Sequence, residues 1–225
     1  MQVDKEYIID IRHKIHEYPE IGFELPRTIA LVKSELEKMG IPYTEKYGEG
    51  SVVGYINQDA KHYTIGLRAD MDALLIQEIN DIPFKSKIDG QMHACGHDAH
   101  MAILLGVAYI LNESHDRITG EIKLIFQPAE ETTGGAKRII DAGSLKKVKA
   151  IFGLHLDPTI NIGEVLYTSQ EMYASSNAFN IDIYGDNCHI VCAVFYDIRV
   201  VCLNFKKQAR AKKTCNCKNK TTQKS

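Results

Sequence analysis

The densest group of chemically active residues is the run HACGHDAH, residues 93–100, which contains three histidines and one cysteine. A cysteine thiolate and a histidine imidazole are both good ligands for borderline-soft divalent metals. Gly96 separates Cys95 from His97 and lets the backbone turn tightly enough for both side chains to face one point. His100 follows one helical turn after His97, where it can support a metal ligand. The alternative to a metal site is a set of surface histidines beside one buried cysteine, none of which binds a metal. Three histidines and one cysteine within eight residues make that alternative less favoured.

A second chemical signal is a pair of adjacent carboxylates, Glu130 and Glu131, at the end of the run QPAEE. The pair follows the apolar run at residues 122–126 directly. Like charges side by side raise each other's pKa and are costly to desolvate, so a nearby cation would compensate them. One carboxylate would then bind the metal while its neighbour acts as general base on a metal-bound water. Alternatively, both residues cap a helix that begins at Thr132.

Two further motifs carry candidate site residues. His155 ends an apolar run; alone, such a residue is more often a structural histidine than a ligand, but the other clusters favour the ligand interpretation. In the run RADMDA, Asp70 and Asp72 occupy alternate positions and point the same way if a strand continues through them. They would orient the ligand histidines or help position a metal-bound water. A solvated turn is the alternative for this pair of aspartates.

The elements that must position these residues alternate along the chain. Helical spacing of apolar residues predicts four helices, which start near Asp4, Pro26, Asp98 and Ala136. Strands are expected at residues 51–56, 63–67, 122–126 and 150–154, the last two of them buried. This alternation predicts an α/β fold with a largely parallel sheet flanked by helices. Active sites of such sheets lie beyond the carboxyl ends of the strands, which is where all the motifs fall.

Composition identifies no special partner but separates the end of the chain from the rest. The 225 residues suit one domain or one domain and part of a second, and the net charge is only −2. Of six cysteines, only Cys95 lies within the first 187 residues, and residues 206–225 carry eight Lys or Arg and no Asp or Glu. That segment is expected to be disordered. We expect a cytoplasmic protein, because neither a secretory signal nor a membrane-spanning run of about 18 apolar residues is visible.

The motifs resemble, as an ordered set, the amidohydrolase branch of the M20 metallopeptidase family. That branch includes hippurate hydrolases, N-acyl-L-amino acid amidohydrolases, N-acetyldiaminopimelate deacetylases and plant auxin-conjugate hydrolases. The motifs are RADMDA (68–73), HACGHDAH (93–100), FQPAEE (126–131) and GLH (153–155), with RHKIHEYPEIGF (12–23) before them. The resemblance implies part of a dinuclear-metal catalytic domain at residues 1–176 and the start of an α+β lid domain at 177–189.

The resemblance also implies a ligand set for two divalent metals, typically manganese, zinc, cobalt or nickel. Cys95 would bridge the metals, His97 and Glu131 would bind one of them, and His155 would bind the other. The implied activity is hydrolysis of the amide bond of N-acyl amino acids or related small amides. The substrate is thus a small molecule, with no nucleic acid or membrane partner, and the family is often homo-oligomeric.

Catalytic and substrate-binding roles follow from the same resemblance. Glu130 would be the general base that takes a proton from the bridging water and passes it to the leaving amine. Asp70 would be a supporting catalytic acid near the metals. His189 matches a histidine of the lid domain that helps bind the substrate or stabilise the oxyanion.

The end of the chain departs from the family pattern. After His189 the family has a small residue and then a Pro-His pair, where this chain has Ile190, Val191 and Cys192. A late metal-binding histidine and most of the lid are also missing. We therefore expect residues 190–225 to be an aberrant segment, and a catalytically inactive truncated or frameshifted remnant is the alternative function. A zinc module for nucleic acid built from the late cysteines is disfavoured, because C-x3-C and C-x-C match no usual finger spacing.

Overall fold

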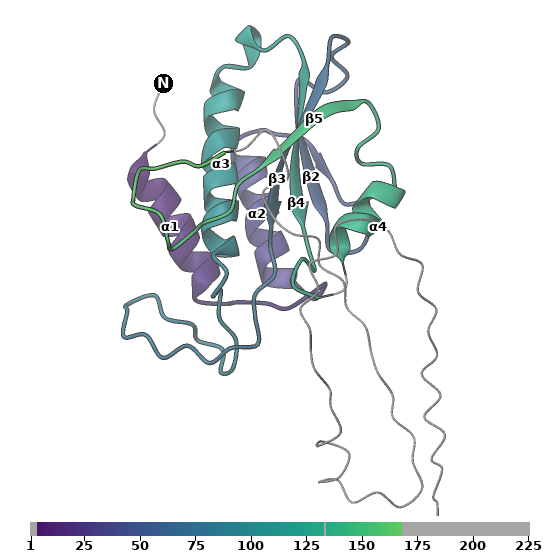
Figure 1. Cartoon of the computed structure of the whole chain (residues 1–225). Coiled ribbons are helices and arrows are strands. Elements are labelled where there is room, and N and C mark those ends of the chain that lie inside the picture. The colour runs from purple at the N-terminus through teal and green to yellow at the C-terminus, as the bar shows by residue number, and fades with distance from the viewer. Residues whose placement is uncertain (1–3, 133, 168–225) are drawn as a thin grey trace, which may run out of the picture. The chain divides into compact units, whose positions relative to one another are not determined.

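The computed structural model describes residues 4–132 and 134–167 (Figure 1). The predicted lid segment at 177–189, His189 within it, and the segment 190–225 lie outside the described residues, so the domain boundaries stay predictions. The elements lie in one compact unit, residues 1–164. In chain order they are α1 (Lys5–His16), α2 (Pro26–Lys38), β1 (Tyr43–Thr44), β2 (Val52–Ile56), β3 (Thr64–Asp70), α3 (His97–Glu113), η1 (His115–Arg117), β4 (Glu121–Gln127), α4 (Gly135–Asp141) and β5 (Val148–Gly153).

The five strands form one mixed sheet in the order β1-β2-β4-β3-β5. β2 pairs antiparallel with β1 and β4, whereas β3 pairs parallel with β4 and β5. The predicted α/β class, with helices flanking a sheet, is confirmed. The parallel arrangement expected for most of the sheet is found for β4, β3 and β5. Its register pairs Asp70 with Gln127, so the segments that follow β3 and β4 leave the sheet side by side.

Alternating side chains of the sheet face two helical layers. Val52, Leu124 and Phe126 are buried in the larger core, which also contains buried residues of α1, α2 and α3. Val53 and Ile125 face the opposite side and pack with α4. Figure 1 shows this arrangement, with α4 on the other side of the sheet from the three longer helices. Burial of each large aliphatic side chain in such layers contributes about 1.5–3 kcal/mol.

Sequence signals for the helix ends agree with the structure. The Asp4 side chain accepts a hydrogen bond from the backbone N–H of Glu6 and caps α1. α2 begins at Pro26, and Gly40 follows its end with φ +68°, a left-handed conformation that favours glycine. No helix among the described residues is both long and apolar enough to cross a membrane.

The expectation that the strand near residues 150–154 is buried was wrong. In β5, Ile151 is 48% and Phe152 58% exposed. β5 lies at the edge of the sheet, where its outer side pairs with no other described strand. An apolar run indicates that a strand needs cover, but it does not show that the described part of the chain supplies that cover.

Candidate metal centre

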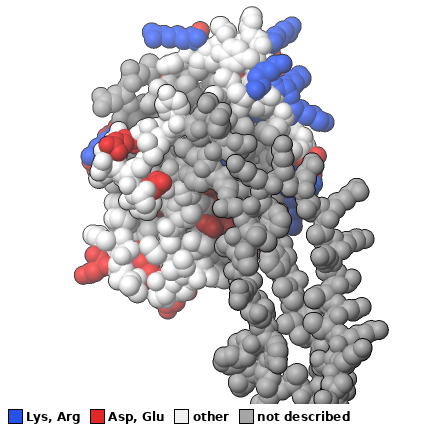
Figure 2. Space-filling view, in the orientation of Figure 1, with Lys and Arg blue, Asp and Glu red and all other residues white. Residues whose placement is uncertain are grey.

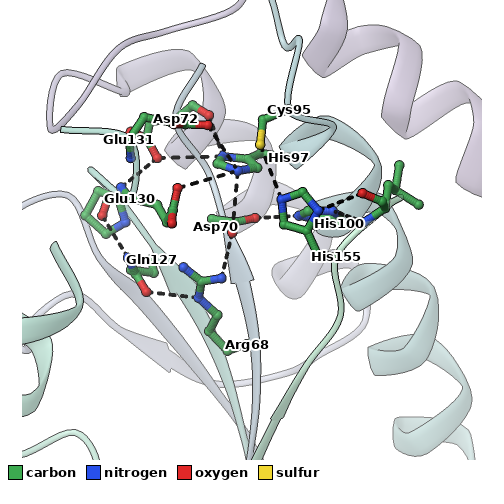
Figure 3. Close-up of polar contacts among 12 residues, drawn as sticks. Arg68, Asp70, Asp72, Cys95, His97, His100, Gln127, Glu130, Glu131 and His155 are labelled. Carbon is green, nitrogen blue, oxygen red and sulfur yellow. Dashed lines mark hydrogen bonds and ion pairs between the residues drawn. The ribbon is translucent and has the colours of Figure 1, made fainter. Parts of the chain in front are cut away.

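The predicted site residues meet beyond the carboxyl ends of β3, β4 and β5 (Figure 3). β3 ends at Asp70, and the segment after β4 carries the glutamate pair. Cys95 immediately precedes α3, which supplies two histidines from its first turn, and His155 follows β5. The structure therefore brings together all the described candidates, from four segments distant in sequence.

His97 has one ring nitrogen anchored and one directed into the site. The ring is fully buried, and its Nδ1 lies 2.7 Å from the backbone oxygen of Asp72. A carbonyl oxygen only accepts, so Nδ1 donates a proton to it, and Nε2 is the ring nitrogen that faces the site. Nε2 lies 3.5 Å from Asp70 Oδ2 and 3.7 Å from Glu131 Oε1. Glu130 Oε2 is 3.9 Å away, which completes a ring of carboxylates around one basic nitrogen.

Cys95 and His155 form the other side of the site. The Sγ atom lies 3.3 Å from His155 Nε2, and His155 Nδ1 donates to the backbone oxygen of Leu156 at 2.7 Å. Burial, followed by the neighbouring Glu131, raises the pKa of the Cys95 thiol to about 12. The thiol is therefore protonated at neutral pH unless a cation replaces its proton.

Asp70 and His100 support the site. Both ring nitrogens of His100 have hydrogen-bond partners, so neither is free to bind a metal ion. His100 Nε2 accepts the backbone N–H of Leu156 at 3.0 Å, so Nδ1 carries the proton and donates it to Asp70 Oδ1 at 2.6 Å. Arg68 donates to the other Asp70 oxygen at 2.6 Å. Burial alone would raise the pKa of Asp70, but the His100 hydrogen bond and the Arg68 charge outweigh it and lower the pKa to about 2. His100 thus ties the segment that carries His155 to β3.

The glutamate pair is held by Asp72 and does not cap a helix. Asp72 Oδ1 and Oδ2 accept the backbone N–H groups of Glu130 at 2.9 Å and Glu131 at 3.0 Å. The next helix, α4, begins only at Gly135 and has no side-chain cap. The capping alternative is therefore wrong, and so is the solvated-turn alternative for Asp72, which is fully buried.

The turn before the pair depends on two small residues. Ala129 has φ +53°, a left-handed conformation that is rare outside glycine. A Cβ atom on Gly135 would lie 1.9 Å from the backbone oxygen of Pro128, so any larger residue there would displace the turn. This local strain is concentrated directly beside Glu130.

The electrostatics of the site favour a cation. Two buried atoms, His97 Nε2 and Glu131 Oε1, have no hydrogen-bond partner among the described residues, and they face each other. Burial and then the charge of Glu131 raise the pKa of Glu130, whose side chain is 43% exposed. Three sets of donor atoms lie close together: Cys95, His97 and His155; Asp70, His97 and His100; His97, Glu130 and Glu131. In the second set both ring nitrogens of His100 already have hydrogen-bond partners, so the first and third sets are the candidates to hold a metal ion. His97 is common to all of them, and thiolate, imidazole and carboxylate groups are donor types that divalent metal ions take.

Some supporting residues had no role assigned from the sequence. Arg68 Nε donates to Gln127 Oε1 at 2.9 Å, which links β3 to β4 at the site. His16, the last residue of α1, contacts two buried acids. Its Nδ1 lies 2.8 Å from Oδ2 of Asp98 in the first turn of α3, and its Nε2 lies 3.3 Å from Glu78 Oε1. Arg68 and Asp70 are alternate residues of one strand, and this spacing could have indicated that their side chains lie on the same face. The His16 contacts join residues more than sixty positions apart, and no spacing pattern reports such a contact.

The chain matches known proteins over most of its length. Residues 66–216 match the family model described as "Peptidase family M20/M25/M40". IAA-amino acid hydrolase ILR1-like 4 of Arabidopsis thaliana is 46% identical over 184 residues, which cover 82% of this chain and 42% of that protein. N-acetyl-L-cysteine deacetylase of Bacillus subtilis is 40% identical over 185 residues, covering 82% of this chain and 44% of that protein.

A solved structure agrees with the same assignment. The crystal structure of the YXEP protein of Bacillus subtilis, a dinuclear metal binding peptidase from the M20 family, matches with a TM-score of 0.67 and 40% sequence identity. The match covers 71% of this chain and 46% of that one. The chain thus spans less than half the length of these relatives.

Proposed function

Because this chain belongs to the M20/M25/M40 peptidase family of enzymes, as its motifs suggested, we propose that its described residues supply part of the active site of an amidohydrolase. The reaction is metal-dependent hydrolysis of the amide bond of N-acyl amino acids or related small amides. The observation that carries this proposal is the buried, unpartnered Nε2 of His97 among the carboxylates of Asp70, Glu130 and Glu131. The printed names of two relatives, an IAA-amino acid hydrolase and an N-acetyl-L-cysteine deacetylase, support the substrate class.

Four residues would hold two divalent metal ions: Cys95, His97, Glu131 and His155. The unpartnered nitrogen of His97 and the unpartnered oxygen of Glu131 fit this role, since a cation would satisfy both. The chemistry supplied by such ions is Lewis acidity, which lowers the pKa of water and polarises the amide carbonyl. The family membership and the similarity to the YXEP protein, a dinuclear metal binding peptidase, support two metal ions in place of one.

Glu130 is the proposed general base. Its carboxylate is the more exposed of the pair, and its raised pKa suits a group that accepts a proton from water and passes it to the leaving amine. Asp72 positions Glu130 through the backbone, which leaves the side chain free to move a proton. A general base of this kind accelerates hydrolysis by about 10²–10⁴-fold.

Asp70 and His189 have different roles in this scheme. With a pKa near 2, Asp70 carries no proton at neutral pH, so we assign it to positioning His100 and facing His97. We keep His189 as a proposed substrate-binding residue outside the described part of the chain.

The 225-residue chain supplies only part of the active site, so we expect no measurable hydrolysis from it. The proposal is tested by hydrolysis of N-acetyl and N-benzoyl amino acids, with added manganese or zinc, by a fusion that completes the described residues with the C-terminal part of a full-length relative. We expect metal-dependent release of the free amino acid, and a loss of about 10²–10⁴-fold in Glu130→Gln. Glu24→Gln, an exposed glutamate outside the site, is the matched control. Turnover by the Glu130→Gln variant at the rate of the unchanged protein would contradict the assignment of the base.

A further inference from the structure

A cleft lies at the opposite end of the sheet from the candidate metal centre. It opens at the amino ends of β3 and β4 and at the loop that leads into β5. Its volume is about 850 Å³, which is large enough for a nucleotide-sized molecule. The metal chemistry proposed above uses none of its residues.

The cleft collects lysines that have no acidic partners. Six lysines line it: Lys46, Lys61, Lys123, Lys146, Lys147 and Lys149. None of the six forms an ion pair within the described residues, whereas five of the other seven described lysines do. The lining contains only two acids, Asp59 and Glu121. Figure 2 shows basic side chains gathered at the upper end of the molecule, the end at which this cleft lies.

Lys123 places a buried positive charge in the lining. The residue is only 5% exposed, and its Nζ donates to the backbone oxygens of Ser144 at 2.7 Å and Lys146 at 3.3 Å. These carbonyl groups, and the Tyr47 ring whose centroid lies 5.9 Å from Nζ, orient the ammonium but do not neutralise it. A buried charge without a counter-charge is unfavourable, and a bound anion would relieve that cost.

Lys147 has a backbone conformation that its residue type does not favour. Its φ is +68°, in the left-handed region where glycine and asparagine are usual. The side chain is exposed at the cleft, between the lining residues Lys146 and Lys149. Three ammonium groups thus come from four consecutive residues, one of them at a strained position.

We propose that this cleft binds a small molecule that carries several linked phosphates. No arginine lines the cleft, so recognition there depends on charge density and not on the bidentate fork that arginine offers to a carboxylate. Several ammonium groups around one concavity suit a compact, multiply charged anion. Tyr63, 36% exposed in the same lining, offers a ring face on which a nucleotide base could stack.

Calorimetric titration of the 225-residue chain with tripolyphosphate and with ATP tests this proposal. The protein is first freed of metal with a chelator, because phosphates also bind metal ions. At about 0.15 M salt we expect micromolar binding of both probes, weakening as salt is added. Lys147→Asn should weaken binding about fivefold, and adding Lys149→Gln should bring the loss to about 25-fold.

The variants separate loss of charge from loss of fold. Asparagine tolerates the left-handed conformation, so Lys147→Asn keeps the loop, and an unchanged thermal melting temperature checks this. Lys137→Asn, which removes a lysine paired with Asp141 on α4, is the control and should bind both probes like the unchanged chain. If ATP binds more tightly than tripolyphosphate and Tyr63→Leu abolishes the difference, the ligand is a nucleotide; equal affinities identify the phosphate chain alone.

Three results would overturn the proposal. The first is no binding of either probe at about 1 mM. The second is Lys147→Asn with unchanged affinity. The third is a single-stranded oligonucleotide of about 20 nucleotides that binds more than about a hundredfold more tightly than either probe, which would make the cleft a nucleic-acid surface.

Discussion

His97 Nε2 and Glu131 Oε1 face each other across 3.7 Å, both buried and both without a hydrogen-bond partner among the described residues. Buried polar atoms in native proteins almost always have a partner. Two such atoms side by side, one an imidazole nitrogen and one a carboxylate oxygen, therefore indicate a site that is completed by a cation.

Metal binding should release a proton from Cys95. Because the pKa of this thiol is about 12 without metal, the thiol is protonated at neutral pH and must lose its proton to bind. The affinity for zinc should therefore rise about tenfold per pH unit between about pH 6 and 8. Calorimetry in buffers of different ionisation enthalpy measures the released proton. Cys95→Ser should bind more weakly and lose this pH dependence; an unchanged slope would show that the proton comes from another group.

Replacing His100 with phenylalanine should weaken metal binding at His155 without removing a ligand. The phenylalanine ring keeps the bulk but loses the bonds to Asp70 and to the N–H of Leu156, which leaves a buried carboxylate oxygen and a part-buried N–H unsatisfied. We expect a loss of about 2–4 kcal/mol in unfolding free energy and about 10–100-fold in metal affinity. Urea unfolding and zinc titration measure the two effects, with the exposed His62→Phe as control. Unchanged zinc affinity would show that His100 does not position His155.

The His16 contacts should make stability fall at alkaline pH. Burial would lower the pKa of His16, but hydrogen bonds to Asp98 and Glu78 outweigh it and raise the pKa above its usual 6.5. The protonated ring is the form that stabilises the fold, so its contribution is complete below about pH 6.5. It is lost as the pH rises through the higher pKa of the folded state. Urea unfolding of the metal-free chain at a series of pH values checks this, and His16→Gln should remove the alkaline loss.

The same contacts should also make stability fall in acid. Hydrogen bonds lower the pKa values of Glu78 and Asp98 despite their burial. Their contribution is therefore present above their usual values, near pH 4, and is lost as the pH falls through the lower values of the folded state. A stability curve that rises toward alkaline pH would contradict the contacts of His16.

The exposed edge at β5 should promote self-association. Ile151 and Phe152 are about half exposed on a strand whose outer side pairs with no strand in the described part of the chain. Phe152→Lys should lower light scattering at high protein concentration, because a charge at an edge strand opposes pairing with another chain. Lys149→Arg, which changes an exposed residue of the same strand and keeps its charge, is the control. Equal scattering by Phe152→Lys and the unchanged chain would exclude this edge as the cause.

The sequence indicated which side chains gather at one place better than it indicated the contacts that hold them there. The dense cluster around Cys95 needs no tertiary information, and the glycine between Cys95 and His97 indicates the turn. Asp72 accepts hydrogen bonds from the backbone of Glu130 and Glu131 because β3 and β4 pair in a parallel register. Local sequence patterns do not show which strands pair or in what register. His155 was ambiguous for the same reason, since a single histidine becomes a ligand only through neighbours distant in sequence. The burial of β5 was mispredicted because apolar content does not specify what covers a strand.

The most direct test of the central claim is the metal content of three variants after dialysis against zinc or manganese, measured by mass spectrometry. The geometry predicts that Glu130→Gln keeps its metal, whereas His97→Gln and Glu131→Gln lose it, because the last two remove the unpartnered atoms that a cation would join. Circular dichroism of each variant controls for folding. Full metal content in folded His97→Gln, or loss of metal in folded Glu130→Gln, would contradict the assignment of ligand and base.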